Sequence, residues 1–189
     1  MDPITFGGNL EDEFFRREDQ RLIARLRELR EAETARETLS QATGITNAAV
    51  LDELLAMKIQ PEIIAALRVV PLVEVAWADG SLDEKERKAV LSGAQEAGIP
   101  ADSAAYALLD AWLKRKPEPY LLAAWTTLVQ GMSASLPAAE VKQFETSLME
   151  RVRRVAGASG GVLGFGSKVS KQEAAVLEKL SKAFELPTS

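Results

Sequence analysis

The stretch Val75-Ala76-Trp77-Ala78-Asp79-Gly80-Ser81-Leu82-Asp83-Glu84-Lys85-Glu86 joins an apolar segment to a charged one and decides the fold. Residues 71–78 are apolar except for Glu74, and a helix without a polar face usually lies in a protein core. Gly80 permits a turn with positive φ. Asp83, with Glu86 three residues later, matches a capping box. The stretch therefore predicts a buried helix, a tight corner at Asp79-Gly80 and a second helix over 84–97.

A second corner repeats this pattern near the end of the chain. The segment Ser167-Lys168-Val169-Ser170-Lys171-Gln172-Glu173 again places an apolar residue before a capping residue, with Glu three positions later. Both segments lead into a helix-forming run that contains Ala-Val-Leu, at 89–91 and at 175–177. Two such corners predict two pseudo-equivalent helical halves.

The first corner also carries a family resemblance. Val75-Ala76-Trp77-Ala78-Asp79-Gly80-Ser81-Leu82-Asp83-Glu84-Lys85-Glu86-Arg87, followed by a helix that ends in Ala97-Gly98-Ile99, resembles the signature of the tellurite-resistance TerB-like family. The resemblance covers about residues 70–186, with Ser167–Leu186 as a degenerate second copy. It implies a compact all-α domain of two related halves and a role in tellurite or other stress responses. It further implies association with membrane or phage-defence systems and metal binding through acidic residues, and it brings no enzymatic activity.

Proline and glycine divide the rest of the chain into helical segments, and no segment shows the two-residue alternation of a strand. A short helix begins at Thr46 or Asn47 and another at Pro61. The sequence thus predicts an all-α helical bundle, with Trp77, Trp112 and Trp125 in its core. The longer predicted helices cover residues 11–43, 71–78, 84–97, 103–115, 119–134, 138–156 and 171–184.

Three regions are expected along the chain: a flexible lead-in (1–10), an N-terminal helical extension (11–69) and the TerB-like helical domain (70–189). The long helix over 11–43 has a narrow apolar stripe made of Phe15, Leu22, Ile23, Leu26 and Leu29. The heptad pattern is too short for a long coiled coil. One interpretation is a solvated helix laid along the main body. The other is an arm that pairs with a second copy or docks on a protein partner.

Asp79, Asp83 and Glu86 are the candidate metal ligands. Their order matches the second half of a calcium-binding EF-hand loop, but Val75 and Trp77 occupy the places of the first two ligand residues. Glu74 lies one turn back and is a further candidate. The alternative is structural, because the same acids suit a turn and a helix cap. No cofactor is predicted apart from a divalent cation at this corner.

Composition excludes several functions. The chain has no Cys and no His, so thiolate nucleophiles, Cys-based metal sites and Ser-His-Asp relays are excluded. We therefore expect a protein that is not an enzyme. The net charge is −5 and no segment is strongly basic, so nucleic acid is not an expected partner. No secretory signal or membrane-spanning run is visible, which favours a cytoplasmic protein.

The glycine-rich segment Gly157–Gly166 lacks the residues of a P-loop and of a dinucleotide-binding loop, so a flexible connector is expected there. Arg151, Arg153 and Arg154 come just before it. Positive charges at a helix end favour the helix dipole. The alternative for these arginines is contact with an anion or with an anionic membrane surface.

Overall fold

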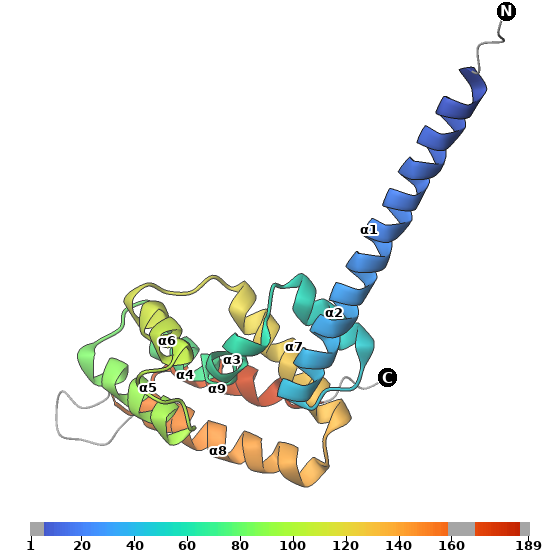
Figure 1. Ribbon diagram of the computed structural model, residues 1–189. Helices are drawn as coiled ribbons and strands as arrows, with labels where there is room; N and C mark the ends of the chain where they lie inside the picture. The colour runs from blue at the N-terminus through green and yellow to red at the C-terminus, as the bar shows by residue number, and fades with distance from the viewer. Residues whose placement is uncertain (1–5, 159–168, 186–189) are drawn as a thin grey trace, which may run out of the picture. The chain divides into compact units, whose positions relative to one another are not determined.

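The computed structural model describes residues 6–158 and 169–185 (Figure 1). The described residues form helices and no strand, so the predicted all-α class is confirmed. None of these helices, within the described ranges, is both long and apolar enough to span a bilayer.

The helices follow the predicted segments to within a few residues at most boundaries. They are α1 (Phe6–Thr43), α2 (Ala48–Ala56), the 3-10 turn η1 (Pro61–Ile63), α3 (Ile64–Arg68), α4 (Val70–Ala76), α5 (Glu84–Glu96), α6 (Ala104–Lys114), α7 (Tyr120–Ser135), α8 (Ala138–Ala156) and α9 (Lys171–Lys182).

Local signals account for most of these boundaries. The side chain of Asn47 caps α2 by accepting hydrogen bonds from two backbone N–H groups of the first turn. Ser103 caps α6 in the same way. Pro71 occupies the first turn of α4, where its missing N–H costs nothing, so a new helix begins there as expected.

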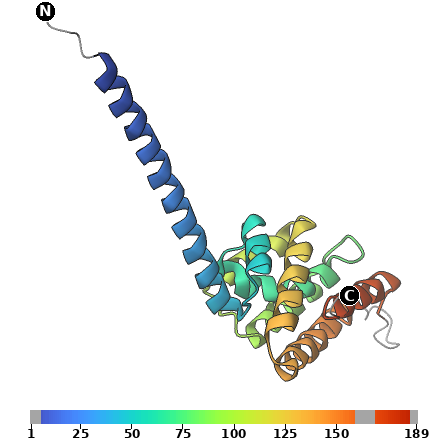
Figure 2. The same ribbon diagram turned by 90° about the vertical axis from the view of Figure 1, so that its right-hand side faces the viewer.

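The apolar helix α4 is central to the core. All of its residues except Glu74 are buried, and it packs against α5, α7, α8 and α9. Figure 2 gives a second view of this bundle. The composition of α4 explains its buried position. A helix with no polar face is stabilised by burial on every side, because each side that water reaches exposes apolar surface.

The chain forms two units, residues 1–38 and residues 39–189. This division differs from the expected boundary at residues 69 and 70. α2 packs on α7, and α3 packs on α6 and α7, so these short helices belong to the main body. Gly131 of α7 permits close packing here, because a Cβ atom at this position would lie 2.6 Å from Cγ1 of Val50. The buried residues between 39 and 69 include Leu39, Ile45, Leu51, Leu54, Ile59, Ile64 and Leu67.

The helix α1 is longer than expected. It begins at Phe6, whereas the sequence predicted a flexible lead-in as far as residue 10. Helix propagation adds one hydrogen bond for each residue fixed, so an established helix extends past weak formers such as Gly7 and Gly8. The end of α1 at Thr43, before Gly44, is as predicted.

Candidate functional site

The corner between α4 and α5 is a hydrogen-bonded turn. Oδ1 of Asp79 accepts hydrogen bonds from the backbone N of Ser81 at 2.9 Å and from its Oγ at 3.1 Å. Gly80 has a φ of +90°, which only glycine adopts without strain. The turn is closed by the N–H of Gly80, which donates to the carbonyl of Trp77. The carboxylate of Asp79 thus fixes the turn.

The next two acids form the predicted capping box of α5. Oδ1 of Asp83 accepts from the backbone N of Lys85 at 2.7 Å and of Glu86 at 2.8 Å. Oε2 of Glu86 accepts from the backbone N of Asp83 at 2.8 Å. Glu86 is 5% exposed. Its carboxylate is therefore directed back at the start of the helix.

The second corner forms the same cap. Oγ of Ser170 accepts from the backbone N of Glu173 at 3.1 Å, and Oε2 of Glu173 accepts from the backbone N of Ser170. Glu173 is also 5% exposed. The equivalence of the two capping boxes is what the structure has in common with the predicted repeat. The residues 167 and 168 that precede this cap lie outside the described residues.

The metal prediction has no geometric support in residues 6–158 and 169–185, where no group of three or more acidic side chains is arranged to hold an ion. Glu74, the further candidate, lines another cavity together with Lys116 and Lys179. Burial raises the pKa of Glu74, and the two lysines oppose that rise. Because nearby lysines repel a cation, Glu74 is a poor ligand. A cation at Asp79, Asp83 and Glu86 stays a prediction.

The stripe of α1 is exposed. Leu22, Ile23, Leu26 and Leu29 are between 50% and 60% exposed. The side chain of Phe15, which the sequence places in the same stripe, lies outside the described residues. Four aliphatic side chains at helical spacing on one face form a surface that soluble chains usually cover. This set is called the α1 stripe below.

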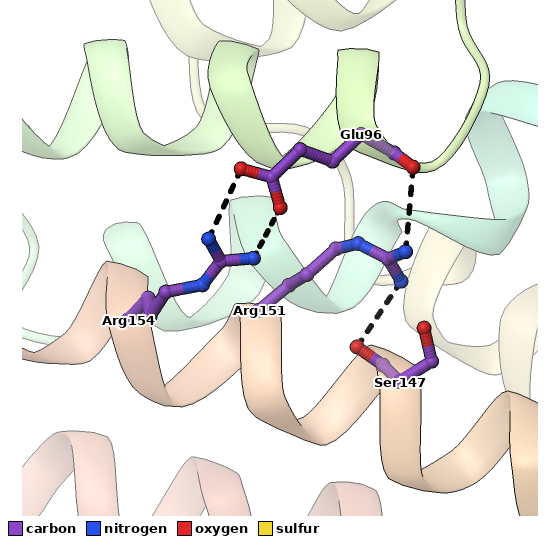
Figure 3. A network of polar contacts seen from close by, with 4 residues as sticks. All are labelled: Glu96, Ser147, Arg151 and Arg154. Atoms are coloured by element: carbon purple, nitrogen blue, oxygen red, sulfur yellow. Dashed lines mark hydrogen bonds and ion pairs between the residues drawn. The ribbon is translucent and has the colours of Figure 1, made fainter.

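The arginines of α8 do not form one basic patch (Figure 3). Arg154 forms a two-pronged ion pair with the carboxylate of Glu96 on α5. Arg151 donates instead to the backbone carbonyls of Ser147, at 3.1 Å, and Glu96, at 3.4 Å. Arg153 is exposed. These bonds tie α8 to the end of α5, and contact with an anionic membrane surface stays a prediction.

Of the three tryptophans predicted in the core, Trp125 is buried there, whereas Trp77 and Trp112 are half-buried at its edge. Trp125 is fully buried and makes an edge contact with the ring of Phe184, and Trp77 and Trp112 pack against the core. Nε1 of Trp77 donates to the carbonyl of Trp112 at 3.0 Å. Most of the predicted glycine-rich connector, residues 159–166, lies outside the described residues.

Arg68 is a candidate ligand-binding residue that the sequence did not indicate. It ends α3, and its guanidinium group is half-buried beside a cavity. A single arginine at the end of a short helix has no distinctive sequence signal. Arg68 becomes half-buried only because α3 packs against helices that are distant in sequence.

Comparison of the chain with protein-family models, with curated proteins and with solved structures finds no match.

Proposed function

We propose that this chain is a non-enzymatic helical interaction module of the TerB-like type, acting in a stress response, and that it associates with a second copy of itself through α1. The observation that carries the proposal is the exposed α1 stripe. Burying a leucine side chain contributes about 2 kcal/mol relative to leaving it in water. A helix that keeps Leu22, Leu26 and Leu29 at 56–60% exposure has that free energy available for association.

The charges along α1 indicate a second copy as the occupant. Residues 11–20 contain five acidic and two basic side chains, a net charge of −3. Residues 21–30 contain four basic side chains and one acidic, a net charge of +3. Two copies in antiparallel orientation place each acidic segment against a basic one. A parallel pair would place like charges together, which is unfavourable.

The antiparallel arrangement predicts specific pairs. With the two-fold axis between positions 20 and 21, Leu26 of one copy lies opposite position 15 of the other, whereas Leu22 and Leu29 lie opposite Asp19 and Asp12. Leu26 is therefore the main apolar contact of this register. Glu18 then lies beside Arg25 of the second copy, and symmetry forms this pair twice. Within one chain, Oε1 of Glu18 lies 3.4 Å from Nη1 of Arg21. The stripe is short, so we expect a reversible dimer rather than an obligate one.

The resemblance around Asp79–Glu86 supports the TerB-like part of the proposal, and the absence of Cys and His supports a role without catalysis. The stress-response role is tested in the source cells by deleting the gene and measuring growth on tellurite. Growth equal to that of the parent strain would count against that role and would leave the self-association untouched.

Sedimentation equilibrium of the full chain at about 5–500 µM tests the self-association. We expect a monomer–dimer equilibrium for the natural chain and a monomer for Leu26→Glu, because a carboxylate cannot be buried in the stripe. Lys88→Glu is the matched control, since Lys88 is an exposed helix residue outside α1. A natural chain that is monomeric throughout would overturn the proposal. Equal association by Leu26→Glu would also overturn it.

A further inference from the structure

A cavity of about 590 Å³ lies between α3, the end of α5 and α8. Its size is typical of sites for small organic ligands. The apolar part of its lining includes Val69, Ile99, Phe144 and Leu148. Two arginines, Arg68 and Arg151, also line it. The cavity therefore offers both an apolar surface and positive charge.

Arg68 has no ion pair in the part of the chain that the structure describes. Its Nη2 donates to the carbonyl of Ala42 at 3.3 Å, and its Nε is buried without a hydrogen-bond partner among the described residues. Burial lowers the pKa of Arg68, and no carboxylate within residues 6–158 and 169–185 counters that effect. A guanidinium group partly removed from water is usually paired with an anion, and here the described residues supply one carbonyl.

Arg151 is in a similar position (Figure 3). Two of its N–H groups bind the carbonyls of Ser147 and Glu96, and its Nε has no partner in the described residues. The carboxylate of Glu96 is bound by Arg154. The other carboxylate of the lining belongs to Glu140, which is exposed. The formal charges of the lining are balanced, but Glu96 is shared between Arg154 and Arg151 and Glu140 is exposed, so Arg68 has no carboxylate of its own among the described residues.

We propose that this cavity binds an amphipathic organic carboxylate, with its carboxylate on Arg68 and Arg151 and its hydrocarbon part on the apolar lining. A guanidinium group binds a carboxylate through two parallel hydrogen bonds, and the terminal N–H groups of Arg68 that the bond to Ala42 leaves unused can form them. The apolar lining contributes affinity that an inorganic anion cannot gain. This site is independent of the α1 stripe.

Calorimetric titration of the full chain with octanoate tests the site, with octan-1-ol and inorganic phosphate as the two matched probes. We expect octanoate to bind at least about ten-fold more tightly than either, because only octanoate has both the charge and the chain. No heat from octanoate at millimolar concentration would overturn the proposal. Binding of octanol or phosphate as tight as that of octanoate would also overturn it.

Two variants locate the binding in the cavity. Arg68→Met keeps the length of the side chain and removes the charge, so octanoate affinity should fall about ten-fold or more while the melting temperature stays level or rises. Ala65→Trp fills the exposed mouth of the cavity and leaves Arg68 in place, so it should also abolish binding. Arg153→Met, an exposed position of α8 outside the lining, is the control and should bind normally. Unchanged affinity in both Arg68→Met and Ala65→Trp would contradict the assignment.

Discussion

Leu29 and Leu39 belong to the same helix, α1, yet Leu29 is 59% exposed and Leu39 is fully buried. The last turn of α1 is part of the core of residues 39–189, whereas the earlier turns belong to the unit of residues 1–38. The same side chain therefore stabilises the fold at one position and stays in water at the other. The hydrophobicity of a residue sets how much free energy its burial can contribute, and the neighbouring helices decide whether it is buried.

The core and the α1 stripe should differ most in how much a leucine contributes to the free energy of unfolding. Leu128→Ala, at a fully buried position of α7, should lower the free energy of unfolding by about 3 kcal/mol, because it removes buried methyl groups and leaves a cavity. Leu29→Ala makes the same chemical change on the α1 stripe. It should alter the free energy of unfolding of the monomer by less than about 0.5 kcal/mol. Urea unfolding at low protein concentration measures both. Equal losses would remove the distinction.

The two capping boxes provide a smaller effect within the main body. Asp83→Ala should cost about 1 kcal/mol of unfolding free energy, since two backbone N–H groups lose their acceptor. Ser170→Ala should cost somewhat less, because one such bond is lost. Asp102→Ala removes an exposed carboxylate outside both caps and is the control. Dimerisation should be unchanged in all three, and a change there would mean that the body contributes to association.

A charge exchange on α1 tests the antiparallel register of the proposed dimer. Glu18→Arg or Arg25→Glu alone should weaken the dimer about five-fold, or about 1 kcal/mol over two symmetric exposed pairs. The double variant should regain the natural affinity, because the antiparallel pairs form again with their signs reversed. Sedimentation equilibrium measures all four chains. A double variant that dimerises more weakly than either single variant would exclude the antiparallel register. The free energy of unfolding of the monomers, measured in urea, should be the same for all four chains.

Local features were predictable from the sequence, because their causes are local. Pro71 begins a helix, Asn47 and Asp83 cap one, and α1 ends before Gly44. Each follows from the conformational limits of one residue or from one side chain that reaches a nearby N–H. The central position of α4 was also predictable, because its composition leaves no face for water.

Tertiary features were not predictable in the same way. Leu39 lies outside the predicted α1 stripe, and its burial depends on the core of residues 39–189. The expected boundary at residue 70 was set by the extent of the family resemblance. The packing of α2 on α7 depends instead on how the surfaces of these two helices fit, which the sequence does not display. Arg68 and Arg151 are distant in sequence, and only the fold brings both to one cavity.

The smallest expected effect concerns a cation at Asp79, Asp83 and Glu86. The Ser170 corner forms the same cap with a hydroxyl group in place of Asp83, so it is an internal control. We expect Ca²⁺ or Mg²⁺ at millimolar concentration to shift the amide NMR signals of both corners equally and slightly. The reason is that Asp79 and Asp83 each accept two hydrogen bonds within the turn and cap, so a cation would have to displace N–H and O–H donors already bound to them. A saturable shift at Gly80 and Ser81 alone, lost in Asp83→Asn, would show that this corner binds a cation that its counterpart cannot hold.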